Sequence, residues 1–142
     1  MALYRHVGDK HALLDGIVER LLMELPLPDP ALHWRARLDQ MSAAMRATAR
    51  RHPTVFPLLL RRPAATPGAL RVREAVYDAL RAAGLAEPDV ERAERMLSTF
   101  ILGFAASEAG GRFSVGSDQL DADLDWFGEQ LLGAVGGGTE GP

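Results

Sequence analysis

Apolar residues recur along the chain at intervals of three and four positions, which is the spacing of a helix that buries one face. No segment alternates apolar and polar residues as a half-buried strand does. The spacing therefore predicts an all-α fold. The expected helices cover 10–25, 30–51, 54–62, 67–83, 88–109 and 117–135.

Short polar residues and prolines mark where several of these helices should begin. Asp9, Asp29 and Thr66 are expected N-caps, because a short side-chain oxygen can accept hydrogen bonds from the free amide groups of a first turn. Pro30 and Pro67 follow two of these caps and fit the first helical position, where the missing amide hydrogen costs nothing.

Glycine and proline shape the remaining elements. Gly84 is expected to end the helix over 67–83 in the left-handed conformation that favours glycine. Pro57 inside 54–62 leaves two interpretations, a helix with proline in its first turn or a kinked helix. The second half of 88–109 is apolar nearly all round, which predicts a central position for that helix.

Length and composition narrow the class of protein. The 142 residues suit one domain with its own core, and the absence of cysteine excludes a disulfide framework. The longest mostly apolar run, 96–106, is far shorter than the about 20 residues that span a bilayer. The first residues lack the charged-then-apolar order of a secretory signal. We therefore expect an intracellular, cytoplasmic protein with no membrane contact.

Charge is unevenly distributed along the chain. The segment 117–142 carries six acidic residues and no lysine or arginine, which excludes binding of nucleic acid through bulk positive charge. Between Asp39 and Glu74 lie seven arginines and no acidic residue. Three interpretations stay open: a site for an anionic effector, a flank facing DNA, or a solvated face partly neutralised by the acidic segment. The seven are Arg46, Arg50, Arg51, Arg61, Arg62, Arg71 and Arg73.

The opening residues carry the most informative motif. Residues 2–22 read Ala-Leu-Tyr-Arg-His-Val-Gly-Asp-Lys-His-Ala-Leu-Leu-Asp-Gly-Ile-Val-Glu-Arg-Leu-Leu. This string resembles the end of the recognition helix and the following helix of TetR-family transcriptional repressors, whose pattern is Leu-Tyr-x-His-Val, a short break, Lys and then a Leu-Leu-Asp run. The tetracycline-repressor branch is the one it looks most like. Weaker similarities follow at Trp34, Arg62-Pro63, 99–103, Phe127-Gly128 and Leu131-Leu132.

The resemblance implies a helix-turn-helix that reads DNA through its second helix. By the matching positions, Tyr4 and His6 would contact phosphates, and Lys10 would contact a phosphate at the start of the next helix. Arg5 stands where that branch has an aromatic residue, so its role is open between a base edge and a phosphate. The alternative is that Tyr4 and His6 pack beside Val7 while Lys10 is a solvated charge.

The resemblance also divides the chain. In this family two helices precede the recognition helix, whereas this sequence begins within it, so we expect 1–25 to be a remnant of the recognition helix plus the connecting helix. A recognition helix without its supporting helix is too short to hold its shape alone, and we expect the polypeptide as given to bind operator DNA weakly. Residues 26–142 would form the ligand-binding and dimerisation domain, with a disordered tail over 136–142.

The regulatory domain of this family binds a small effector in its helical interior, which gives a set of candidate ligand contacts. They are mostly apolar and aromatic, as a small-molecule cavity requires, although each one taken singly is more often ordinary core, and we expect only some of them to line a cavity. Arg62 would contact an anion if it points inward, since a buried guanidinium must be paired. The candidates are Trp34, Leu38, Met41, Met45, Phe56, Leu60, Arg62, Val76, Leu80, Met96, Thr99, Phe100 and Phe104.

Dimerisation is also implied by the resemblance, through the last two long helices. The small residues Gly103, Ala106 and Gly128 would allow helices to approach closely. The alternative is that the last helix only covers its own core. The candidate interface residues are Leu97, Ile101, Leu120, Leu124, Phe127, Leu131 and Val135.

No metal, cofactor or catalytic site is expected. Thr99 stands where the tetracycline-repressor branch has a histidine that helps to hold a metal-chelated drug, and the four histidines share no helical face. Cysteine nucleophiles, phosphate-binding glycine loops and the His-Glu-x-x-His pattern are missing, which argues against an enzyme. The leading hypothesis is a ligand-responsive repressor with three partners. They are operator DNA, which the full-length protein would bind, a small hydrophobic or anionic effector, and a second copy of the chain. The alternative is an effector-binding or scaffolding helical dimer without a DNA role.

Overall fold

The computed structural model describes the backbone of residues 2–136 and the side chains of residues 8–134. This part of the chain is helical and contains no strand, which confirms the predicted all-α class. The expected disordered tail lies outside the described residues except for Gly136, at which the last helix ends. The elements in order are α1 (Ala2–Glu24), α2 (Trp34–Arg51), the 3₁₀ helix η1 (Phe56–Arg61), α3 (Pro67–Ala82), α4 (Glu87–Ala109) and α5 (Ser117–Gly136).

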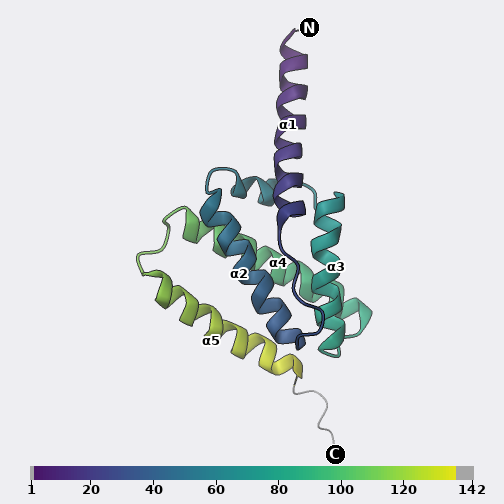
Figure 1. Cartoon of the computed structure of the whole chain (residues 1–142), viewed down its shortest axis with the longest axis vertical. Helices are drawn as coiled ribbons and strands as arrows, with labels where there is room; N and C mark the ends of the chain where they lie inside the picture. Colours follow the sequence, from purple (N-terminus) through teal and green to yellow (C-terminus); the bar gives the residue numbers. More distant parts are fainter. Residues whose placement is uncertain (1, 137–142) are drawn as a thin grey trace, which may run out of the picture.

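The core lies where α2, α3 and α4 pack against one another and against the last turns of α1 (Figure 1). Phe56, Leu80 and Val90 are its largest fully buried side chains, one each from η1, α3 and α4. Burying such a side chain contributes about 1.5–3 kcal/mol, so these three residues anchor the short η1 and both neighbouring helices to one centre. The predicted central position of α4 holds, because α4 contacts α2, α3 and η1.

The helix α1 projects from this body, with its first turns beyond the other helices (Figure 1). It runs unbroken from Ala2 to Glu24, so the expected break and N-cap at Asp9 were wrong. Gly8 and Asp9 are exposed, and no other described element meets the helix there. Continuing the helix satisfies every backbone amide in these turns, whereas a break would leave several without partners.

Three hydrogen bonds with α3 hold the end of α1 to the body. The Glu19 carboxylate accepts a hydrogen bond of 2.6 Å from the Gly68 amide in the first turn of α3, where the helix dipole favours an anion. A side chain at Gly68 would place its Cβ 2.9 Å from the Leu22 Cβ, so only glycine allows this approach. Arg71 donates to the carbonyl oxygens of Leu22 and Leu25, which the end of α1 leaves free.

The start of α2 differs from the prediction. The helix begins at Trp34, with the His33 side chain accepting a hydrogen bond of 3.3 Å from the Arg35 amide, and not at Pro30. Asp29 instead closes a tight turn, in which its Oδ1 accepts from the Ala31 amide at 2.9 Å. An aspartate followed by proline suits such a turn as well as a helix N-cap, and the sequence does not separate the two.

The remaining ends follow the predicted signals. Pro57 lies in the first turn of η1, which decides between the two interpretations of that segment. Thr66 caps α3 through a hydrogen bond of 3.3 Å from the Ala69 amide. Gly84 adopts φ +94° after α3, and the Leu85 amide donates back to the Leu80 carbonyl, as in a glycine C-cap.

The last helix, α5, lies along the outer side of the body (Figure 1) and is attached by a few side-chain contacts. Phe127 stacks on Phe100 of α4 with ring centroids 4.2 Å apart. Arg35 of α2 donates to the Gly128 carbonyl at 2.9 Å, and a Cβ at Gly128 would collide with that guanidinium. The neighbour at position 128 is thus the flexible end of an arginine and not a helix backbone, and a larger residue would require only that guanidinium to shift.

The strongest link between α5 and the body is Arg46 of α2. Its guanidinium donates to Glu108 of α4 at 2.6 and 3.0 Å and to Asp121 of α5 at 2.6 Å. The side chains of Arg46 and Glu108 are each only 9% exposed, and Arg50 adds a second cation to Glu108 at 2.9 Å. Removing one partner from such a buried cluster leaves an uncompensated charge, which is strongly destabilising.

This arrangement predicts different costs for two arginines that bind the same carboxylate. Arg46→Met should lower the free energy of unfolding by about 3 kcal/mol, because Glu108 and Asp121 lose a buried cation. Arg50→Met should lower it by less than about 1 kcal/mol, since Arg50 is half exposed. Urea unfolding followed by circular dichroism measures both. Equal effects of the two substitutions would contradict this account of α5 attachment.

Candidate functional site

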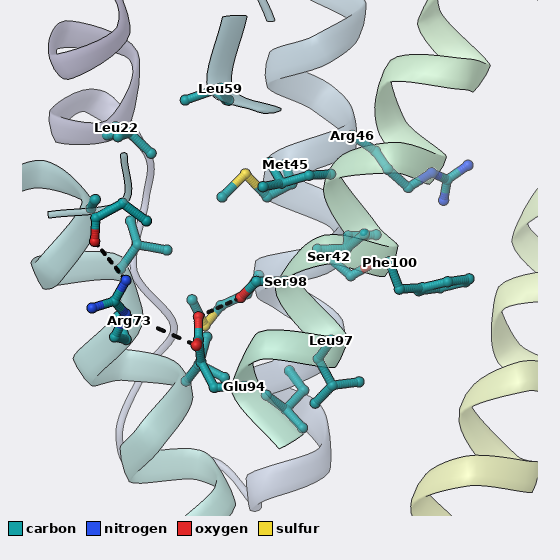
Figure 2. Close-up of a pocket in the computed structure, with 18 of the residues that line it drawn as sticks. Leu22, Ser42, Met45, Arg46, Leu59, Arg73, Glu94, Leu97, Ser98 and Phe100 are labelled. Carbon is teal, nitrogen blue, oxygen red and sulfur yellow. Dashed lines mark hydrogen bonds and ion pairs between the residues drawn. The ribbon is translucent and has the colours of Figure 1, made fainter. Parts of the chain in front are cut away.

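The body contains a cavity of about 750 Å³, which we call the central cavity. All five α-helices, η1 and the loop over 62–66 contribute to its lining. A volume in this range accommodates a drug-sized molecule. Figure 2 shows side chains from α1, η1, α2, α3 and α4 converging on the same space.

Most of the lining is apolar. Leu22 enters from α1, Leu59 from η1 and Met45 from α2, and Figure 2 shows these side chains facing one another. Phe100 of α4 points toward α5, where it stacks on Phe127, so an aromatic pair lies at the α5 side of the cavity. Such a surface binds a ligand mainly by removing its apolar area from water.

A polar cluster of Arg73, Glu94 and Ser98 interrupts this apolar lining. Glu94 of α4 accepts a hydrogen bond of 2.6 Å from the Ser98 hydroxyl, one turn further along the helix. Arg73 of α3 donates to the Ala64 carbonyl at 2.5 Å, and its Nε lies 3.9 Å from the other Glu94 carboxylate oxygen. Figure 2 shows the three side chains along one edge of the cavity, below Leu22 and Met45.

A second ion pair joins the cavity to the projecting helix. Arg62 lies 2.6 Å from Asp15 of α1, and both side chains line the cavity. The Arg62 side chain is 19% exposed, so it points inward enough to remain a candidate contact. Its charge is already matched by Asp15.

Six of the thirteen predicted ligand contacts line the central cavity. The lining residues among them are Leu38, Met41, Met45, Arg62, Val76 and Phe100. Phe56 and Leu80 are fully buried core residues instead, because the spacing that marks a buried face does not tell a packed neighbour from a cavity. The other candidates outside the lining are Trp34, Leu60, Met96, Thr99 and Phe104.

Two of these departures have a direct cause. Leu60 is 49% exposed because η1 is a 3₁₀ helix with three residues per turn, which places Leu59 and Phe56 on the inner side and turns Leu60 outward. Phe104 packs against Phe100 and Phe113 and lies under the Arg46 guanidinium, so its ring fills space outside the cavity.

The polar cluster was missed by the sequence reasoning, although α4 carries a signal for it. Glu94 and Ser98 are four positions apart and interrupt the apolar face formed by Val90, Leu97 and Ile101. Polar residues that break a buried face at helical spacing indicate either a structural ion pair or a ligand contact. Arg73 comes from another helix, and no local pattern connects it to Glu94.

Most of the predicted interface residues of α4 and α5 face inward in this chain. Leu97, Ile101, Leu124 and Phe127 line the cavity, and Leu120 is buried. Leu131 also contributes to the lining but is 47% exposed. Val135 lies outside the described side chains. Because the structure contains a single chain, the dimer contact of these residues stays a prediction.

The predicted DNA contacts lie at the far end of α1. Lys10 is exposed on the projecting helix, as a phosphate contact requires. The side chains of Tyr4, Arg5 and His6 lie outside the described part of the structure, and their role stays a prediction.

The seven arginines between Asp39 and Glu74 do not form one free positive face. Arg46, Arg62 and Arg73 face acidic groups, and Arg71 binds the end of α1. Asp121 from the acidic segment is one of the neutralising partners. Among the described side chains there is no group of three potential metal ligands, and no described helix is long and apolar enough to cross a membrane.

The fold is that of a known family of helical domains. The sequence model of the tetracyclin repressor-like C-terminal domain matches residues 27–125. This chain belongs to the TetR family. Its α1 precedes the matched segment.

Curated relatives of this TetR-family chain include two transcription regulators. The HTH-type transcriptional repressor DrrR1 of Streptomyces coeruleorubidus is 34% identical over 112 residues, which are 76% of this chain and 41% of the relative. An HTH-type transcriptional regulator of Saccharopolyspora erythraea is 34% identical over 109 residues, 76% of this chain and 46% of the relative. The chain thus spans less than half the length of the curated relatives it matches.

Solved structures of the family share the fold. BioQ, solved with its natural double-stranded DNA operator, has a TM-score of 0.72 at 27% identity and covers 95% of this chain and 76% of its own. ActR of Streptomyces coelicolor, solved with actinorhodin, has a TM-score of 0.63 at 23% identity and covers 99% of this chain and 71% of its own. The helical body with its projecting α1 is therefore the arrangement found in this family.

The Arg46 cluster at the rim of the cavity predicts a pH dependence of stability. The hydrogen bond from Arg46 lowers the pKa of Glu108 below its ordinary value of 4.5, against the opposing effect of burial. A lowered pKa in the folded state contributes stability above the ordinary value, and that stability is lost as the pH falls through the folded-state pKa. The free energy of unfolding should therefore decrease below about pH 4.5.

The comparison that isolates Glu108 uses two substitutions. Glu108→Gln should flatten the acid side of the stability profile, measured by urea unfolding between pH 3 and 7 in steps of about one unit. Glu91→Gln makes the same change at an exposed position of the same helix. Its free energy of unfolding should fall with decreasing pH as steeply as that of the parent chain. An equally steep acid limb in Glu108→Gln would show that another group causes it.

Proposed function

We propose that this chain is the effector-binding part of a ligand-responsive transcriptional repressor. The effector binds in the central cavity and releases operator DNA from a reader to which the first turns of α1 belong. The single observation that carries the proposal is a mostly apolar cavity of about 750 Å³ in the helical body of a TetR-family chain. A mostly apolar pocket of this size with a few polar groups is typical of small-molecule sites, which favours a binding role.

The solved relatives supply examples of both partners. ActR was solved with actinorhodin and with (S)-DNPA, and BioQ was solved with double-stranded DNA. We carry these partners to the present chain as classes only, a small organic molecule and duplex DNA. A protein that binds operator DNA acts in the cytoplasm, and we include this location in the proposal.

The geometry of α1 supports a connection between the two partners. Asp15, Val18 and Leu22 of this helix line the cavity, and Lys10 lies in the same unbroken helix toward its free end. An effector that binds better when α1 takes a different angle shifts the population toward that angle, and a rigid helix carries the shift to its far end. Tyr4, Arg5 and His6 lie at that end and would contact DNA.

Dimerisation through α4 and α5 is the third part of the proposal. Met96 of α4 is 70% exposed and Trp126 of α5 is 62% exposed, both unusually open for large apolar residues. A two-fold mate covering these helices would bury both. The inward residues Leu124 and Phe127 would then support the interface from behind.

Filling the cavity tests the binding role. Ser42 of α2 lines the cavity, and Ser42→Phe should weaken binding of any cavity ligand at least tenfold by occupying its space. A panel of hydrophobic metabolites and antibiotics is screened by thermal unfolding, where a ligand at 100 times its Kd adds about 2.7 kcal/mol to stability. Ala82→Phe adds the same bulk at an exposed position of α3 and should bind like the parent chain. Hits that bind Ser42→Phe unchanged would place the ligand elsewhere.

Sedimentation equilibrium tests the dimer. The parent chain should sediment as a dimer at about 10 μM, in the range of a specific protein interface. Trp126→Glu should shift it to a monomer by placing a charge in the apolar contact. Leu70→Glu, at a residue of α3 that is 45% exposed, should leave the dimer intact. A parent chain that remains monomeric at tenfold higher concentration would contradict the dimer.

A further inference from the structure

The charges that line the central cavity do not favour an anion. Three arginines and five acidic residues contribute to the lining. Each of these arginines already has an acidic partner. Arg46 pairs with Glu108 and Asp121, Arg62 pairs with Asp15, and Arg73 pairs with Glu94. An anionic ligand would have to displace one of these carboxylates and approach the others.

Within this lining, Arg73 and Glu94 face each other without a direct hydrogen bond. The Arg73 Nε and the nearer Glu94 oxygen are 3.9 Å apart, beyond hydrogen-bond distance. Each group is held back by a different neighbour, Arg73 by the Ala64 carbonyl at 2.5 Å and Glu94 by the Ser98 hydroxyl at 2.6 Å. One donor group and one acceptor group therefore remain open to the cavity at the same place.

The chemistry of this gap selects one kind of ligand group. A hydroxyl can donate its hydrogen to Glu94 and accept a hydrogen bond from Arg73 at the same time. A carboxylate would repel Glu94, an ammonium group would repel Arg73, and a methyl group would form a hydrogen bond with neither. Hydrogen bonds to charged groups are stronger than those between neutral groups, so the preference should be large.

We propose that the central cavity takes an uncharged, mostly apolar molecule that places a hydroxyl group between Arg73 and Glu94. This inference rests on the proposed role of the cavity as a ligand site and adds the class of ligand. Ser98 acts as a positioning residue, because it binds one Glu94 oxygen and leaves the other directed at Arg73. The apolar part of the ligand lies against Leu22, Met45 and their neighbours (Figure 2).

The test uses four fluorescent probes that differ in one substituent. These are 1-methylpyrene, 1-pyrenemethanol, 1-pyrenecarboxylate and 1-pyrenemethylamine, titrated with the full chain at pH 7 and followed by fluorescence anisotropy. We expect 1-pyrenemethanol to bind about tenfold more tightly than 1-methylpyrene, and both charged probes to bind more weakly than the alcohol.

Variants locate the preference at the polar cluster. Glu94→Leu should remove the advantage of the alcohol while 1-methylpyrene binds as well as before, and Glu94→Gln should keep part of it because an amide oxygen still accepts. Glu91→Leu makes the same change at an exposed position of α4 outside the cavity and should keep the full advantage. Arg73→Met tests the same gap from α3 and should also reduce the advantage.

The outcomes separate this inference from the proposed function. The hydroxyl inference is wrong, while the ligand site stands, if all probes bind and the alcohol binds no more tightly than 1-methylpyrene. It is also wrong if Glu94→Leu and Arg73→Met still bind the alcohol more tightly than 1-methylpyrene. Tightest binding of the carboxylate or of the amine overturns it in favour of a charged ligand. If no probe binds, the ligand role of the cavity itself fails.

Discussion

The buried guanidinium of Arg46 is the contact on which the shape of the body depends. It joins α2 to Glu108 of α4 and to Asp121 of α5, and it is the one charged residue among the described buried residues. A buried arginine must keep its partners at hydrogen-bond distance, so the separation of three helices is fixed by polar geometry. Apolar packing alone would draw these helices together until the space between them was filled.

The same principle holds around the rest of the cavity. Glu19 binds the start of α3, Arg71 binds the end of α1 and Arg73 binds the Ala64 carbonyl. These contacts lie at the ends of elements, while the middle of the space between the elements is lined by apolar side chains such as Met45. Well-directed contacts at the edges can hold a cavity open that close packing would otherwise remove.

Sequence reasoning found the fold because its signals are local. The cap at Thr66, the glycine at 84 and the apolar spacing each act within one or two turns of helix, and all appear in the structure. Two signals failed, at Asp9 and Asp29, where a polar residue next to glycine or proline suits a turn, a cap or an uninterrupted helix. The site was harder, because a cavity wall and a packed core use the same residue types. Arg46 is 62 positions from Glu108 and 75 from Asp121, and periodicity contains no information on such pairs.

The central claim is that the interior of this TetR-family chain is a ligand site, and the methionine methyl groups report on it most directly. Met41 and Met45 line the cavity, whereas Met23 and Met96 are exposed. In a nuclear magnetic resonance titration of methyl-labelled protein with 1-pyrenemethanol, the account predicts saturable shifts of the Met41 and Met45 signals while Met23 and Met96 stay in place. Shifts confined to Met96, or no saturable shift at Met41 and Met45, would contradict it.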